Sequence, residues 1–116
     1  MQNLALVVMD GNLTADPESK KTKSEKTVTQ FTVALNHEWG AKEGKNSVSF
    51  IPVECWDKLA DNCGRFLKKG SRVTVQGQLR QDRWKDDNGQ NHSRVKVIAR
   101  DVRFDQRPAA AAEAAA

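Results

Sequence analysis

The chain has 116 residues, a hydrophobic fraction of 38%, a charged fraction of 29% and a formal net charge of +4. This length suits one domain that removes roughly two-thirds of its surface from water on folding. The low hydrophobic fraction favours a compact β domain over a thick layered enzyme. The positive charge suits an anionic partner such as nucleic acid, although many basic domains are simply soluble.

The N-terminus, MQNLALVVMDG, carries no basic leader, and its apolar run ends at Asp10. That run is too short for the core of a signal peptide or for a membrane span. The sequence therefore predicts a soluble intracellular protein.

The first half of the chain contains three segments that are predicted to form β-strands, at residues 4–13, 27–36 and 47–56, and the second alternates most clearly. The first strand is expected to break at Asp10-Gly11, because glycine within a strand often marks a bulge or a tight bend. A polar, basic segment lies between the first two strands. A glycine-bearing polar loop at residues 40–47 joins the second and third strands into a long hairpin.

One helix is predicted after the third strand. Asp57 is expected to cap its start, and two lysines followed by Gly70 are expected to end it. Residues at helical spacing make its apolar face, and they are Leu59, Cys63, Phe66 and Leu67.

Two more strands follow the helix, at residues 71–84 and 92–104, and a turn at residues 86–89 joins them. The inward residues of the fourth strand are Val73, Val75, Gly77 and Leu79. The alternation of the fifth strand is irregular near Ile98-Ala99.

Five strands with one helix between the third and fourth is the pattern of the OB-fold, a small all-β Greek-key barrel. We expect residues 1–106 to form this one domain. Residues 107–116 include the low-complexity run AAAAEAAA and are predicted to form a disordered tail.

No motif supports an enzyme, a cofactor or a metal site. The glycines at residues 64–70 do not match a phosphate-binding GxxxxGK[ST] loop, and residues 84–89 lack the first carboxylate of a calcium loop. Cys55 and Cys63 lie eight residues apart without a CxxC motif, which predicts buried reduced thiols. His37 and His92 are interpreted as residues of surface loops or strand ends.

Four aromatic residues depart from the inward pattern of the strands. Phe50 and Trp56 share the even face of the third strand, Trp39 lies at the mouth of the loop, and Trp84 ends the polar face of the fourth strand. Exposed rings among lysines and arginines suit a binder of single strands, because each stacked base contributes about 1–3 kcal/mol whatever its identity. The alternative is that these rings pack under loops or at a subunit interface.

With these residues in place, the chain closely resembles the bacterial single-stranded DNA-binding protein family. The resemblance runs from about Asn3 to Phe104 and rests on LVVMDGNLTADPE, QFTVALNHEW, CWDKLADNCGRFLKKGSRVTVQGQLR and RWKDDNGQ. It implies that bases stack on Trp39, Phe50, Trp56 and Trp84. It also implies that phosphates are contacted by Lys20, Lys58, Lys69, Arg80 and Arg83. To these we add the loop residues Lys42 and Lys45, because they are basic and lie beside Trp39.

The resemblance further implies a homotetramer in the bacterial cytoplasm, associated with the nucleoid, that coats single-stranded DNA during replication, recombination and repair. The family's acidic, apolar C-terminal tip is missing here. Either the chain is truncated or tagged, or the recruitment of replication and repair proteins is missing or different. Other possible functions are an RNA-binding OB module, a primosomal accessory protein and a protein-interaction OB domain.

A second departure from the family is Pro52, which stands mid-strand where relatives often have a polar or basic side chain. Proline cannot donate a backbone hydrogen bond, so the strand is expected to lie at an edge or to bulge there.

Overall fold

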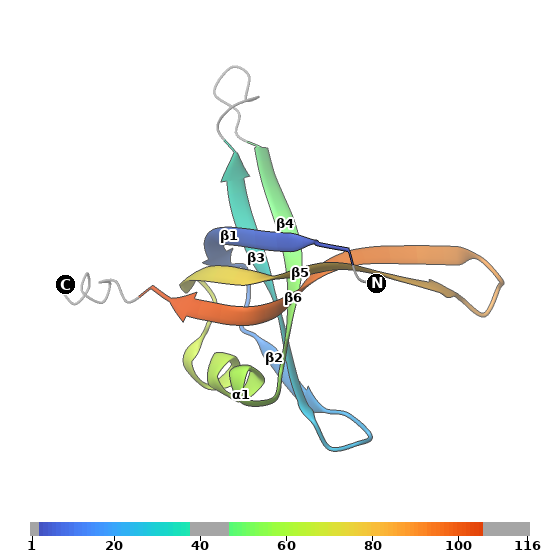
Figure 1. Ribbon diagram of the computed structural model, residues 1–116, viewed down its shortest axis with the longest axis horizontal. Coiled ribbons are helices and arrows are strands. Elements are labelled where there is room, and N and C mark those ends of the chain that lie inside the picture. The colour runs from blue at the N-terminus through green and yellow to red at the C-terminus, as the bar shows by residue number, and fades with distance from the viewer. Residues whose placement is uncertain (1–2, 38–46, 106–116) are drawn as a thin grey trace.

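The computed structural model describes residues 3–37 and 47–105, and the predicted tail at 107–116 lies outside them. Six strands and one helix occur in this described part of the chain (Figure 1). They are β1 (Leu6–Leu13), β2 (Glu18–Lys21), β3 (Thr27–His37), β4 (Ser47–Trp56), α1 (Asp57–Phe66), β5 (Arg72–Lys85) and β6 (Asn91–Phe104).

The strands close into a barrel in the order β1-β5-β6-β4-β3, because β3 pairs back onto β1. The closing pair is antiparallel and joins Asn12 to Ala34. The one parallel pairing, between β4 and β6, joins Val53 to Val97. Five strands in a closed barrel with one helix confirm the predicted OB-fold class.

The short strand β2 was not predicted. Its sequence, ESKK, is exposed throughout, so no alternation of apolar and polar residues marks it. It pairs with β3 from Glu18 opposite Gln30 to Lys21 opposite Thr27. Since β1 and β2 both pair with β3, they act as two halves of one bent barrel strand. Counted in this way, β4 is the third barrel strand and β5 the fourth, so the helix lies between the third and fourth strands as predicted.

The core is built from the predicted inward residues. Phe31, Val33, Val53, Val73 and Val75 are each at most 5% exposed. Their strands alternate as a sheet with one buried face requires. The assignment of these odd-numbered residues to the interior is confirmed.

Cys55 and Cys63 lie in this core as free thiols, with their sulfur atoms 3.8 Å apart. The hydrogen bond to Cys63 raises the pKa of Cys55, and burial adds to the effect. The thiol of Cys55 therefore stays protonated, as predicted for a buried reduced cysteine.

The helix α1 lies across one end of the barrel (Figure 1). Ala60 and Cys63 of the helix are fully buried, and the hydroxyl of Thr29 in β3 donates a hydrogen bond to the carbonyl oxygen of Ala60 at 2.8 Å. This buried bond fixes the helix to the barrel wall.

Two predictions about the helix were wrong. Asp57 belongs to the helix, and the capping position is Trp56, with no side-chain hydrogen bond at the cap. Phe66 was placed on the apolar face but is 60% exposed. It lies at the last turn, beyond the barrel wall, where its ring centroid is 6.3 Å from that of Phe104.

Two glycines allow strands to cross closely. The predicted break at Asp10-Gly11 is wrong, because β1 pairs with β5 without interruption there. A Cβ atom on Gly11 would instead collide with the carbonyl oxygen of Ala34. Gly77 lies against the carbonyl of Ile98, beside a register shift that confirms the predicted irregularity in the last strand.

The hairpin of β5 and β6 extends beyond the barrel (Figure 1). We call the part of β5 and β6 from Arg80 to Lys96 the hairpin arm. The register between β1 and β5 ends at Gln78, so Leu79 lies at the rim and is half exposed, contrary to the prediction that it points inward.

Candidate nucleic-acid interface

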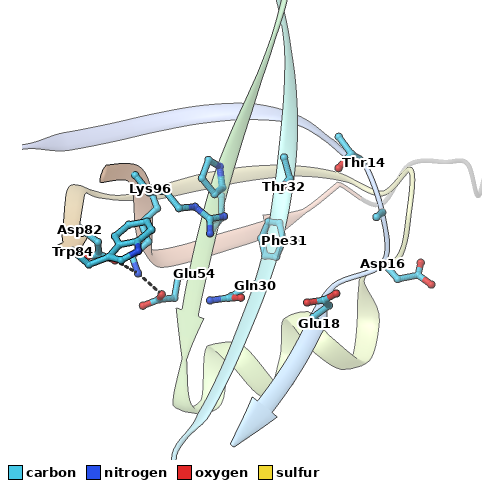
Figure 2. A pocket seen from close by; sticks show the side chains of 14 residues that line it. Thr14, Asp16, Glu18, Gln30, Phe31, Thr32, Glu54, Asp82, Trp84 and Lys96 are labelled. Carbon is cyan, nitrogen blue, oxygen red and sulfur yellow. Dashed lines mark hydrogen bonds and ion pairs between the residues drawn. The ribbon is translucent and has the colours of Figure 1, made fainter. Parts of the chain in front are cut away.

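A groove of about 350 Å³ lies between the hairpin arm, the β3–β4 sheet and the link from β1 to β2 (Figure 2). Its β3 and β4 wall consists mainly of outward, even-numbered residues, and the arm supplies the opposite wall. The β3–β4 wall includes Gln30, Thr32, Pro52 and Glu54, and the wall formed by the arm includes Asp82, Trp84, Arg94 and Lys96.

The structure places Phe50 and Trp56 on the outward face of β4, as the sequence predicts. Phe50 is 62% exposed and Trp56 is half-buried, whereas Val53 and Cys55 between them point into the core. The groove residues Pro52 and Glu54 lie between the two rings on the same face. Six residues of strand separate the rings by about 20 Å, so each ring is a separate platform at one end of the groove.

Strand β4 tolerates a proline at position 52 because no neighbouring strand needs a backbone N–H there. Pro52 is opposite Thr32 in β3, but the carbonyl of Thr32 accepts a hydrogen bond from Thr14 and so points away from β4. The Pro52–Thr32 pair is therefore one that exchanges no backbone bonds. On the other side, the register with β6 begins only at Val53. The prediction that the strand lies at an edge near Pro52 is confirmed.

Trp84 stands on the hairpin arm and is 49% exposed. One face of its ring stacks on His92, with centroids 5.6 Å apart and ring planes at 19°. His92 Nε2 lies 2.8 Å from Asp86 Oδ2 in the turn. The hydrogen bond with His92 lowers the pKa of Asp86, and the backbone N–H of Gln90 adds to the effect.

The sequence interpretation missed this role of His92. The backbone hydrogen bond between Asp86 and Gln90 closes the turn, and counting back equally from these two residues sets Trp84 opposite His92. The turn bounds predicted from the sequence, 86–89, would have set Trp84 opposite Asn91 instead.

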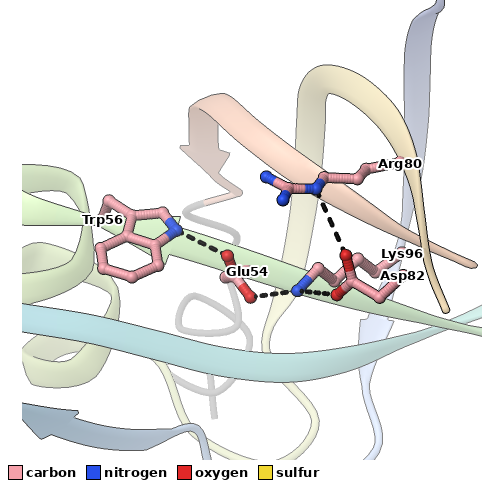
Figure 3. Close-up of polar contacts among 5 residues, drawn as sticks. All are labelled: Glu54, Trp56, Arg80, Asp82 and Lys96. Carbon is pink, nitrogen blue, oxygen red and sulfur yellow. Dashed lines mark hydrogen bonds and ion pairs between the residues drawn. The ribbon is translucent and has the colours of Figure 1, made fainter. Parts of the chain in front are cut away.

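A chain of polar contacts crosses the groove from Trp56 to Arg80 (Figure 3). The indole N–H of Trp56 donates to Glu54 Oε2 at 2.6 Å, and Lys96 Nζ donates to Glu54 Oε1 at 2.6 Å. Lys96 Nζ also lies 2.7 Å from Asp82 Oδ2, and Arg80 Nε lies 3.3 Å from Asp82 Oδ1. Glu54 is only 6% exposed, so these partners take the place of the water that its carboxylate has lost.

The pKa values of the groove's ion pair follow from these contacts. Burial lowers the pKa of Lys96, but its hydrogen bonds to Asp82 and Glu54 outweigh burial and leave it raised. The hydrogen bond from Lys96 holds the pKa of Asp82 below its ordinary value. Both groups are charged at neutral pH. Sequence reasoning missed Glu54, Asp82 and Lys96, because only the fold brings β4 next to the arm.

The predicted phosphate-binding residues come from several elements. Lys20 lies on β2, Lys58 on α1, Lys69 after the helix and Arg83 on the arm, and all four are exposed. Arg80 is exposed but paired with Asp82. None of these five lines the groove, although Arg83 lines a smaller hollow beside Trp84. Three predicted site residues, Trp39, Lys42 and Lys45, lie outside the described residues.

Within residues 3–37 and 47–105, no group of three or more histidines, cysteines, aspartates or glutamates could hold a metal ion. The helix in this part of the chain is neither long nor apolar enough to cross a membrane.

A closed five-stranded barrel with a helix across one end and an aromatic-flanked groove on its face defines a protein of the OB-fold class. Residues 4–105 match the single-strand binding protein family. The chain belongs to that family, as its resemblance in sequence predicts.

Several bacterial proteins are similar to this chain. A single-stranded DNA-binding protein of Caldanaerobacter subterraneus subsp. tengcongensis is 40% identical over 98 residues, which are 84% of this chain and 65% of that protein. Single-stranded DNA-binding protein 2 of Streptococcus agalactiae serotype III is 40% identical over 93 residues, 80% of this chain and 70% of the relative. Single-stranded DNA-binding protein A of Bacillus subtilis is 36% identical over 98 residues, 84% of this chain and 57% of the relative. The matched part is thus between 57% and 70% of the length of these three relatives.

Proposed function

We propose that this chain is a non-enzymatic protein that binds single-stranded DNA with little regard to sequence. Bases stack on Phe50, Trp56 and Trp84, and on Trp39 by analogy with the family. The observation that carries the proposal is that Trp84 lines the groove while Phe50 and Trp56 flank its residues Pro52 and Glu54 on the outward face of β4, in a member of the single-strand binding protein family. Ring faces suit this task because every base has a π-face to stack on.

The charges around the groove support an orientation for the strand. Four carboxylates line the groove against two cations, Arg94 and Lys96. Lys96 is already neutralised by Glu54 and Asp82, so the groove carries net negative charge and disfavours phosphate except beside Arg94. We infer that bases point into the groove and that the backbone runs outside it. The proposed outer contacts are Lys20, Lys58, Lys69, Arg80 and Arg83, together with Lys42 and Lys45.

The proposal includes self-association into a homotetramer. Leu6 and Val8 on β1 and Leu4 just before it are 58%, 63% and 91% exposed, which is unusual for three apolar side chains so close together. Between Leu6 and Gly11, β1 pairs only with β5 in the described residues, so its other edge is open. An open edge beside an apolar stripe suits a second copy of the chain. The number four comes from the family resemblance.

We also propose that the protein coats and protects DNA strands during replication, recombination and repair in the bacterial cytoplasm, associated with the nucleoid. The curated relatives named above are bacterial proteins, and their names specify single-stranded DNA. That the protein recruits replication and repair proteins is proposed from the family resemblance alone.

A pair of matched substitutions tests the binding proposal. Phe50→Ala removes a ring beside the groove, and Phe66→Ala removes an equally exposed ring at the helix end of the barrel. In fluorescence-anisotropy titrations of a labelled oligo-dT, Phe50→Ala is expected to weaken binding by about 1–3 kcal/mol, roughly 5- to 150-fold. Phe66→Ala is expected to leave binding unchanged.

Equal affinity of wild type and Phe50→Ala would contradict base stacking on this face. Competition with an RNA oligomer of the same length separates the RNA-binding alternative, which requires RNA to displace DNA. A protein-interaction OB domain predicts no binding of either oligomer.

A further inference from the structure

The hairpin arm is held against β4 by little backbone pairing. The parallel register between β4 and β6 covers only Val53 with Val97 and Glu54 with Ile98. The pairing of β5 with β1 ends at Gln78, before the arm begins. Both pairings lie outside the arm, so side chains must hold the arm in place over the groove.

One lysine makes the electrostatic link between the arm and the barrel. Lys96 is 16% exposed and its Nζ lies between Glu54 of β4, at 2.6 Å, and Asp82 of the arm, at 2.7 Å. Among the ion pairs of the described residues, Lys96–Glu54 is the one that joins the arm to β4.

The same contacts reach two aromatic platforms, Trp56 on β4 and Trp84 on the arm. Glu54 accepts the indole N–H of Trp56 at 2.6 Å, which fixes the rotation of that ring. Asp82 precedes Trp84 by two residues and so lies on the same face of β5. Lys96 thus contacts one carboxylate that orients Trp56 (Figure 3) and another, Asp82, that lies beside Trp84 on the arm (Figure 2).

We propose that Lys96 is a positioning residue, which sets the relative placement of Trp56 and Trp84 and makes no contact with DNA phosphate. This inference rests on the proposed function. To reach a phosphate, Lys96 would have to leave Glu54, and a carboxylate only 6% exposed would then keep its charge without its cation. Retaining the pair avoids that cost, so the lysine stays in the groove when DNA binds.

Arg94 provides the matched control. It lines the same groove on the same strand of the arm, but it is exposed and makes no ion pair within the described residues. A cation of this kind is available to a phosphate. Comparing substitutions of Lys96 and Arg94 therefore distinguishes positioning of the rings from neutralisation of phosphate in the same groove.

The experiment measures oligo-dT affinity over a range of salt concentrations for wild type, Lys96→Met, Lys96→Arg and Arg94→Met. Lys96→Met is expected to weaken binding about tenfold, comparable to one lost stacking contact, and to leave the log-log salt slope unchanged. Lys96→Arg, which keeps the charge, is expected to restore most of the affinity. If Arg94 contacts a phosphate, Arg94→Met reduces the slope by about 0.7.

A smaller salt slope in Lys96→Met would overturn the inference, because it would show a lost phosphate contact. So would unchanged affinity in that variant while wild type binds, and this outcome would leave the proposed function intact. Failure of wild type to bind oligo-dT would instead remove the proposed function. If Lys96→Met does not fold, the neutral double variant Glu54→Gln/Lys96→Met gives the same slope test without an unpaired buried charge.

Discussion

Phe50, Trp56 and Trp84 differ in how firmly the fold holds them. Phe50 is mostly exposed on an outward face of β4. Trp84 is half exposed and has one face covered by His92. Trp56 is half-buried, and its indole N–H is bound to the buried Glu54. A ring that is oriented before binding loses less conformational freedom when a base stacks on it.

This difference predicts that the same conservative change lowers stability at one tryptophan and not at the other. Trp56→Phe keeps a ring but leaves Glu54 without one hydrogen-bond donor, which is expected to lower the free energy of unfolding by about 1–3 kcal/mol. Trp84→Phe is the control, because no hydrogen bond of the Trp84 indole occurs in the described residues. Urea unfolding followed by circular dichroism measures both. Equal stability of the two variants would show that the Trp56–Glu54 bond contributes nothing.

At the scale of elements, the sequence predicted the strands that carry buried alternation and missed what depends on contacts between strands. The strands of Phe31, Val73 and Val75 could be predicted because the face of a strand that packs in the core must be apolar. The exposed strand β2 has no such pattern and is specified by pairing with β3. Leu79 alternates correctly but sits where the barrel ends, which no local pattern reveals.

The candidate site divides in the same way. The outward positions of Phe50 and Trp56 follow from the alternation of β4. The outward position of Trp84 follows in the same way from the alternation of β5. The Glu54–Lys96–Asp82 ion pairs join residues of three strands, 42 positions apart in the case of Glu54 and Lys96. Such contacts depend on the parallel β4–β6 pairing, and a single sequence contains no local signal for it.

The ion pairs between β4 and the arm predict a pH dependence of stability. Because Asp82 has a lowered pKa in the folded protein, its contribution is present above the ordinary value of 3.8 and is lost as pH falls through the folded pKa. Because Lys96 has a raised pKa, its contribution is present below 10.5 and is lost as pH rises beyond that value.

The stability difference between wild type and Lys96→Met should therefore form a plateau between about pH 5 and pH 9 and shrink on both sides. Thermal unfolding over this pH range measures it. A difference that persists unchanged at pH 2 would mean that the ion pairs do not stabilise the arm.

On the scale of the whole molecule, the barrel presents different surfaces for different tasks. The groove lies between the arm and the β3–β4 sheet, and α1 covers an end of the barrel (Figure 1). The apolar stripe of Leu4, Leu6 and Val8 lies at the start of β1 and just before it. None of these three residues lines the groove, so self-association through β1 is compatible with an open DNA site.

Substitution of the stripe tests the assembly. Val8→Asp places a charge on the exposed face of β1 without touching the core, and it is expected to reduce the molar mass measured by light scattering. Phe66→Asp, also at an exposed apolar position, should leave the mass of wild type unchanged. A wild-type protein that is monomeric at every concentration would contradict the proposed tetramer.

The most direct test of the proposed function is a titration of tryptophan fluorescence with oligo-dT at several salt concentrations. Base stacking predicts strong quenching, and phosphate neutralisation predicts an affinity that falls with salt by about 0.7 logarithmic units per neutralised phosphate for each tenfold rise in salt. Absence of quenching at saturating oligo-dT, or an affinity independent of salt, would contradict binding of single-stranded DNA by stacked bases and neutralised phosphates.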